Sequence, residues 1–159
     1  MPVKLADAAA EFLACKRIAV TGVSRHPQGH GSNAVFERLL ERGYDAVPIN
    51  PEATEIVGHP AYPTLAAVPG GVEAVVIGTR PAHALDTVKE AVDLGITKVW
   101  MHRSVDAGSV SPEAVAYGRE HGLLVIDGGC PLMFDPAADG AHKVMCAMLK
   151  LTGRVPRQV

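Results

Sequence analysis

Three segments of this sequence repeat one local pattern, in which a helix-like apolar periodicity ends in acid-x-Gly and an apolar strand follows within a few residues. The segments are ERGYDAVPIN (41–50), DLGITKVWMH (93–102) and EHGLLVID (120–127). Glycine readily adopts the left-handed conformation that ends a helix and turns the chain back toward a sheet. Short apolar strands that alternate with helices are typical of βαβ units. We therefore expect a parallel sheet covered by helices.

The same alternation extends over the rest of the chain. RIAVTGV (17–23) follows an amphipathic helix near 5–14, whose apolar residues recur at helical spacing. The fold expected from this order is an α/β, Rossmann-like, doubly wound fold with a mostly parallel sheet of five or six strands, helices on both faces and RIAVTGV as a central strand. The other predicted strands are at Asp45–Asn50, 73–79, within 93–102 and at Leu123–Asp127. The other predicted helices are at 82–94, 112–121 and about 138–151. Pro81 and Pro112 lie near helix starts, and Ser111 is placed as an N-cap.

The segment between 51 and 72 breaks this pattern. It is rich in proline and glycine, which favours a loop over a full helix. We expect a short edge strand near Pro60–Tyr62 and one helical turn at Leu65–Val68.

Length and composition narrow the class of protein. The chain has 159 residues, of which 48% are hydrophobic and 20% charged, and its formal net charge is −2. This predicts a single domain over 1–159, with its core at about 11–150, and disfavours nucleic acid as a partner. No apolar stretch approaches the roughly 20 residues of a membrane helix. The N-terminus lacks a continuous apolar signal region, so we expect a cytoplasmic protein.

Ligands of such sheets bind outside the carboxyl ends of the strands, where the strand order reverses. The loop after the first predicted strand has Gly22 at a tight turn, and Ser32 or Asn33 is placed to cap the next helix. A helix N-terminus of this kind attracts phosphate, although any doubly wound protein contains a similar turn. The loop has neither G-x-G-x-x-G nor a Walker lysine.

Two further strand ends help to discriminate among phosphate ligands. NAD-binding folds usually place an acid at the end of the second strand, whereas this chain has Asn50-Pro51, with Glu52 only after the proline. That difference disfavours NAD, and Asn50-Pro51 suits an adenine or a ribose. Arg25 and Arg80 add two cations near predicted helix starts, where they can bind phosphate or simply be solvated.

The order of these motifs resembles that of the small single-domain CoA-binding proteins. The resemblance rests on VTGVS, LLERGYDAVPINP, EIVGHPAYPTLAAVP, VEAVVIGTRP and a late CP, and it covers about residues 11–150. These proteins are similar to the CoA-binding domain of the succinyl-CoA synthetase alpha subunit. The resemblance implies that coenzyme A or an acyl-CoA binds with its pyrophosphate near 22–33, its adenosine near Asn50-Pro51 and its pantetheine arm along 78–81. The implied contacts are Gly22, Ser24, Arg25, Ser32, Asn50, Pro51, Gly78, Thr79, Arg80 and Pro81.

Two departures from the family pattern bear on the ligand. Many relatives have a lysine after Asn-Pro that suits the 3′-phosphate of CoA, and here Glu52 takes that place. Where relatives often have Gln and Gly after the Trp-containing strand, this chain has MHRSV (101–105). We therefore expect the 3′-phosphate contact and the far end of the pocket to differ from those of relatives.

Catalysis has weaker support in the sequence. Cys130 and His102 are predicted at neighbouring strand ends, where a thiol beside an imidazole can act as a nucleophile, but buried cysteines and structural histidines are more common. With His142 they could in principle bind zinc, yet no close pair of ligands anchors such a site, and we predict no metal. The leading hypothesis is a non-catalytic binding or sensing module with a possible protein partner or homo-oligomer. Cys-dependent acyl transfer, an NAD(P)-linked oxidoreductase and an NAD(H) sensor remain alternatives.

Overall fold

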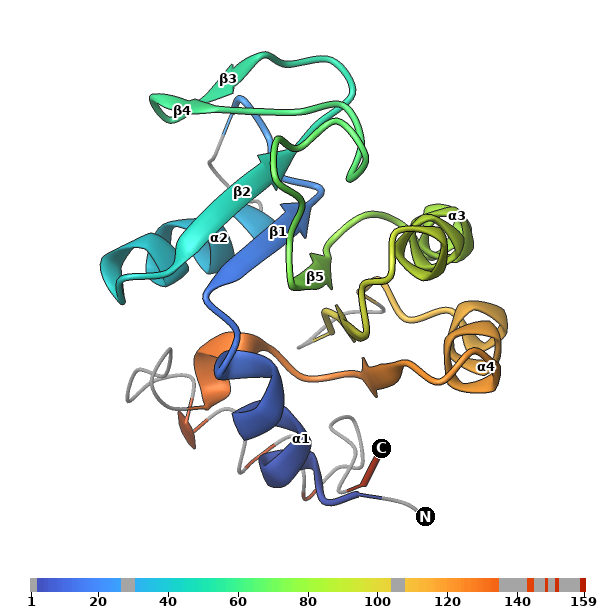
Figure 1. Ribbon diagram of the computed structural model, residues 1–159. Coiled ribbons are helices and arrows are strands. Elements are labelled where there is room, and N and C mark those ends of the chain that lie inside the picture. The colour runs from blue at the N-terminus through green and yellow to red at the C-terminus, as the bar shows by residue number, and fades with distance from the viewer. Residues whose placement is uncertain are drawn as a thin grey trace.

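The structure is a computed structural model that describes residues 3–26, 31–103, 108–134, 143–144, 148, 151 and 158–159. A five-stranded parallel sheet forms its centre, with the strand order β2-β1-β5-β6-β7 (Figure 1). The elements are α1 (Leu5–Leu13), β1 (Arg17–Thr21), α2 (Gly31–Glu41), β2 (Asp45–Ile49), β3 (Glu55–Ile56), β4 (His59–Pro60), β5 (Ala74–Ile77), α3 (Pro81–Asp93), β6 (Lys98–Met101), α4 (Pro112–Glu120), β7 (Leu124–Asp127) and the 3-10 turn η1 (Pro131–Met133).

The strand order reverses between β1 and β5. From β1 the chain moves outward to β2, returns across the sheet to β5 and then continues outward through β6 and β7. The predicted α/β class and parallel sheet are confirmed. The expectation that the first strand lies centrally needs one correction, because β1 is an interior strand whereas β5 occupies the middle. The switch between β1 and β5 opens a crevice at the carboxyl ends of these strands, where ligands of doubly wound sheets bind.

Side chains that alternate along each strand bury themselves in two separate cores. On β1, Ile18 and Val20 join the core that contains α1 and α2, whereas Ala19 joins the core that contains α3 and α4. The same alternation holds on β5, where Val76 and Val75 belong to different cores. This period of two places one pair of helices on each face of the sheet (Figure 1).

Most predicted helices begin and end close to the expected residues. The apolar residues that recur at helical spacing in α1 are all buried: Leu5, Ala8, Ala9, Phe12 and Leu13. Pro81 and Pro112 lie in the first turns of α3 and α4, and the Ser111 hydroxyl accepts a hydrogen bond from the Ala114 N–H at 3.3 Å. The predicted helix at about 138–151 lies mostly outside the described residues.

The segment after β2 differs in detail from the sequence prediction. The expected edge strand near Pro60–Tyr62 is instead the short antiparallel hairpin of β3 and β4, followed by a single parallel bridge between Tyr62 and Ile49. The turn expected at Leu65–Val68 is present, because the Val68 N–H donates to the Leu65 carbonyl. The bridge at Tyr62 holds the start of the following loop beside the end of β2.

Candidate functional site

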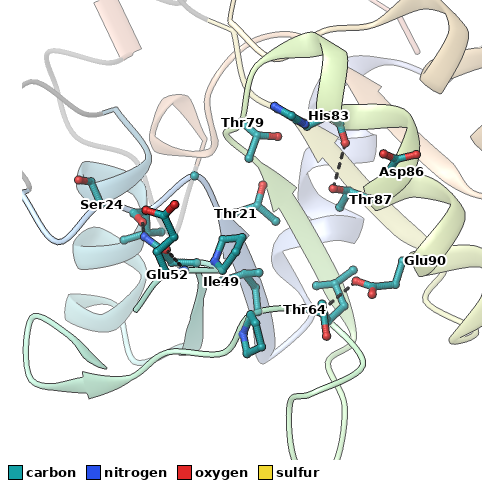
Figure 2. A pocket seen from close by; sticks show the side chains of 16 residues that line it. Thr21, Ser24, Ile49, Glu52, Thr64, Thr79, His83, Asp86, Thr87 and Glu90 are labelled. Atoms are coloured by element: carbon teal, nitrogen blue, oxygen red, sulfur yellow. Dashed lines mark hydrogen bonds between the residues drawn. The ribbon is translucent and has the colours of Figure 1, made fainter. Parts of the chain in front are cut away.

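A cleft of about 550 Å³ opens at the carboxyl ends of β1, β2 and β5, on the side of α3. Figure 2 shows Ser24 and Glu52 on one side of the view, Thr21 and Thr79 near the middle, and His83, Asp86, Thr87 and Glu90 on the other side. The lining comes from four segments of the chain: 21–24, 49–52, 63–65, and position 79 with the first three turns of α3. The cleft therefore lies where the reversal of strand order predicts a ligand.

Two glycines allow the chain segments to approach closely beneath this cleft. A Cβ atom on Gly78 would lie 1.8 Å from the Ser32 Oγ and 2.7 Å from the Thr21 carbonyl oxygen. A Cβ atom on Gly22, which has a φ of +77°, would lie 2.4 Å from the Gly78 carbonyl oxygen. Neither position has room for a larger residue without movement of the backbone. Gly78 and Ser32 thus help to build the floor of the cleft and do not line it.

An asparagine on α2 fixes the loop that follows β1. The Asn33 Oδ1 accepts from the Ser24 N–H at 2.8 Å, and the Asn33 Nδ2 donates to the Ser24 carbonyl at 2.9 Å. The sequence suggested Asn33 as a cap for its own helix. That suggestion was wrong, because both polar atoms of this 2% exposed side chain pair with Ser24.

A second asparagine connects the ends of β1 and β2. The Asn50 Nδ2 donates to the Val23 carbonyl at 3.0 Å, and its Oδ1 accepts from the Glu52 N–H at 2.8 Å. The second contact is a local turn that asparagine side chains commonly stabilise. Asn50 therefore lines the cleft, but its side chain mainly holds the ends of β1 and β2 together. Its amide is less available to a ligand than its position in the sequence implied.

The hydroxyl of Thr79 lies at the cleft with no hydrogen-bond partner within the described part of the chain. Its Oγ1 is buried, and Thr79 also contributes to the lining. A buried hydroxyl without a partner costs free energy, so such groups in folded proteins usually mark a water, an ion or a ligand. Among the described lining residues, Thr79 is therefore the one whose side chain most needs a hydrogen-bond partner from outside the protein, such as a water or a ligand.

The charges around the cleft are mainly negative. Glu52, Asp86 and Glu90 line it, and the Glu90 Oε1 accepts from the Leu65 N–H at 2.8 Å. Among the described lining residues, none is lysine or arginine. Arg25 and Arg80 are exposed and directly follow two lining residues, so both cations lie beside the cleft and outside its lining.

The structure divides the residues implied by the resemblance into two sets. Gly22, Ser24, Asn50, Pro51 and Thr79 line the cleft. Arg25, Ser32, Gly78, Arg80 and Pro81 lie next to it in sequence or support it from below, without lining it.

The sequence prediction missed the wall that α3 provides. His83, Asp86, Thr87 and Glu90 all line the cleft. Their spacing of three and four residues puts them on one face of a helix, and this spacing was the available signal. It could be recognised as a ligand-facing surface only once the tertiary position of α3 was known.

The two weak catalytic candidates lie away from the lining of the cleft. Cys130 is 2% exposed and precedes η1. The His102 ring contacts the start of α2, because its Cε1 would lie 3.4 Å from a Cβ on Gly31. Among the residues that the structure describes, no cluster of three or more His, Cys, Asp or Glu side chains is arranged to hold a metal. His142 lies outside the described residues.

Comparison with known proteins identifies the family. A family profile described as "CoA binding domain" matches residues 16–136, which include the whole sheet and every described lining residue. The chain belongs to the CoA binding domain family. This result confirms the resemblance that the motifs indicated, and it agrees with the position of the cleft at the β1–β5 switch in strand order.

Two proteins of similar length resemble this chain in sequence or in structure. The uncharacterised protein YneT of Bacillus subtilis (strain 168) is 29% identical over 111 residues, which are 70% of this chain and 78% of YneT. A hypothetical protein of Pyrococcus horikoshii OT3 has a similar structure, with a TM-score of 0.72 and 29% identity over 79% of this chain and 85% of its own.

A larger protein contains a comparable domain. The dinucleotide-forming acetyl-coenzyme A synthetase 1 of Ca. Korarchaeum cryptofilum, in complex with phosphate and ADP, has a TM-score of 0.59 and 25% identity. The match covers 70% of this chain and only 25% of the synthetase. The shared part is therefore one unit of a much longer enzyme.

Proposed function

We propose that this CoA-binding domain binds coenzyme A or an acyl-CoA in the cleft at the β1–β5 switch, as a non-catalytic binding or sensing module of the cytoplasm. The observation that carries the proposal is the cleft itself, which lies at the strand ends of a chain that belongs to the CoA binding domain family.

The proposed pose follows from the segments that line the cleft. The pyrophosphate would lie against the loop at Gly22–Ser24, which Asn33 holds in place, with Arg25 beside it. The adenosine would lie by Asn50–Pro51, and the pantetheine arm would pass Thr79, whose buried hydroxyl has no partner in the described structure and would have to rotate about χ1 to reach the arm. The residues present therefore fit a ligand of this class.

The non-catalytic role rests on the position of the nucleophile candidate. Cys130 is almost fully buried and does not line the cleft, so its sulfur would need a structural rearrangement to meet a bound thioester. The described lining of the cleft includes no cysteine, so Cys-dependent acyl transfer has no thiol at the proposed ligand position. Binding without chemistry is the simpler use of this arrangement.

Calorimetric titration with CoA, acetyl-CoA and NAD tests the proposal. We expect CoA or acetyl-CoA to bind, and either to raise the unfolding free energy by about 2.7 kcal/mol at 100 times its dissociation constant. Binding of NAD together with no heat and no thermal shift from any CoA derivative would contradict the proposal. Turnover of acetyl-CoA to free CoA would replace the non-catalytic role with the acyl-transfer alternative.

A further inference from the structure

Glu52 occupies a defined position at the mouth of the cleft. The Asn50 side chain accepts from the Glu52 N–H at 2.8 Å and donates to the Val23 carbonyl at 3.0 Å, so one amide fixes both the turn at Glu52 and the end of β1. Because β1 and β2 are adjacent parallel strands, Glu52 lies one strand over from the loop proposed to hold the pyrophosphate. In nucleotide-binding α/β folds this is the place where the adenosine ribose meets the protein.

The negative charge of the cleft lining disfavours a 3′-phosphate at the ribose position beside Glu52. Glu52, Asp86 and Glu90 bring three carboxylates to the cleft, and its described lining holds no lysine or arginine. A phosphate monoester carries a charge of about −1.5 to −2 at neutral pH. A carboxylate at the ribose would repel a 3′-phosphate, whereas it can accept hydrogen bonds from two free ribose hydroxyls.

We propose that Glu52 is a specificity-determining residue that accepts hydrogen bonds from a free ribose diol and disfavours a 3′-phosphate. The ligand that the cleft binds most tightly is then an ADP-containing molecule with a free ribose diol, which within the CoA class is dephospho-CoA. Glu52 would take the role that the acid at the end of the second strand has in NAD-binding folds, although it follows Pro51. The inference rests on the proposed function only in that the adenosine end of the ligand lies beside β2. Glu52 is exposed, and within the described part of the chain the turn uses its backbone N–H and leaves its carboxylate available to a ligand.

Parallel calorimetric titrations with CoA and dephospho-CoA at one fixed salt concentration test this assignment. We expect the protein to bind dephospho-CoA about fivefold more tightly than CoA. The Glu52 carboxylate would accept from the free ribose diol of the first ligand and repel the 3′-phosphate of the second. Glu52→Lys should reverse the order of the two affinities, because the lysine attracts the 3′-phosphate of CoA and cannot accept hydrogen bonds from the ribose diol. Glu52→Gln, which removes the charge and keeps the shape, should bring the two affinities to within about twofold.

A matched control separates a local contact from a general change of charge. Glu55 is exposed, lies three residues further along and does not line the cleft. Glu55→Lys makes the same change in net charge and should leave the ratio of the two affinities unchanged. Thermal unfolding of each variant checks that the fold is retained.

The outcomes distinguish this inference from the proposed function. Tighter binding of CoA than dephospho-CoA by the unaltered protein, or equal changes in the ratio from Glu52→Lys and Glu55→Lys, would overturn the role of Glu52 and leave CoA binding intact. Failure of both ligands to bind would overturn the proposed function and the inference with it.

Discussion

At the scale of single residues, the cleft depends on small or polar side chains that permit close packing at the ends of β1 and β5. Gly78 leaves space for Ser32 and the Thr21 carbonyl, and Asn33 and Asn50 each use both amide atoms to hold a turn. The sequence indicated that these positions matter. It could not show that both asparagines serve the protein backbone, because that depends on which strand ends meet in space.

Replacement of Thr79 by valine separates binding from stability. Valine has nearly the same shape and removes a buried hydroxyl that has no partner within the described structure. The unfolding free energy of the free protein should therefore stay the same or rise by up to about 1 kcal/mol. Affinity for CoA and dephospho-CoA should fall about tenfold, as measured by calorimetry, because the ligand loses a hydrogen bond. A large loss of stability without loss of affinity would assign Thr79 a purely structural role.

Replacement of Gly78 by alanine tests the close approach below the cleft. The new Cβ would meet the Ser32 Oγ at 1.8 Å, so the chain must shift, and we expect a loss of about 1–3 kcal/mol in urea unfolding. Gly31→Ala is the control, because among the described residues its Cβ would meet the His102 ring at 3.4 Å, which is ordinary van der Waals contact. Adding Ser32→Ala to Gly78→Ala should recover part of the loss, and equal stability of the two single glycine variants would contradict the packing described.

At the scale of elements, the sequence predicted the helices and strands of the main sheet well because their signals are local. Acid-x-Gly marks three helix ends, and prolines mark the starts of α3 and α4. In the segment after β2, only a short edge strand near Pro60–Tyr62 was predicted, which overlaps β4, and its pairing with β3 was missed because strands of two residues carry no periodicity. The α3 wall was also missed, because a polar helix face normally indicates solvent and only the fold turns it toward the cleft.

The cap of α4 gives a prediction for one element. The Ser111 Oγ accepts from the Ala114 N–H, so Ser111→Ala should reduce the unfolding free energy by about 1 kcal/mol. Ser111→Asp, which retains a capping oxygen, should keep most of that stability in the same urea titration. Ligand affinity should not change in either variant because α4 does not line the cleft. Equal losses from both substitutions would show that the cap is not the cause.

At the scale of the whole molecule, two groups in the core on the side of α1 set the behaviour at high pH. Burial raises the pKa of the Cys15 thiol and also that of the Tyr44 hydroxyl, which donates to the Leu13 carbonyl. Glu73 and Glu11 add to the rise in the pKa of Cys15, and Lys98 opposes it. Both groups therefore hold their protons more tightly in the folded chain than in the unfolded chain.

The stability should accordingly fall as the solution becomes alkaline. The contribution is complete below the ordinary thiol pKa of about 8.5 and is lost as pH rises through the raised values, because the unfolded chain then binds fewer protons. Urea unfolding between pH 7 and 10 measures the beginning of the loss that belongs to Cys15, because the loss that belongs to Tyr44 starts only above the ordinary tyrosine pKa of about 10. Cys15→Ser should flatten the earlier part of the decline, and an unfolding free energy that rises over this range would contradict the assignment.

Chemical-shift mapping tests most directly whether a CoA-type ligand occupies the cleft. In backbone amide NMR spectra recorded during titration with dephospho-CoA and with CoA, we expect the largest changes at Gly22, Ser24, Glu52 and Thr79, which line the cleft on three different segments. The amides near Val3, Leu123 and Val159, which line a second groove on the molecule, should stay unchanged. Changes confined to that second groove, or none at saturating ligand, would contradict the account.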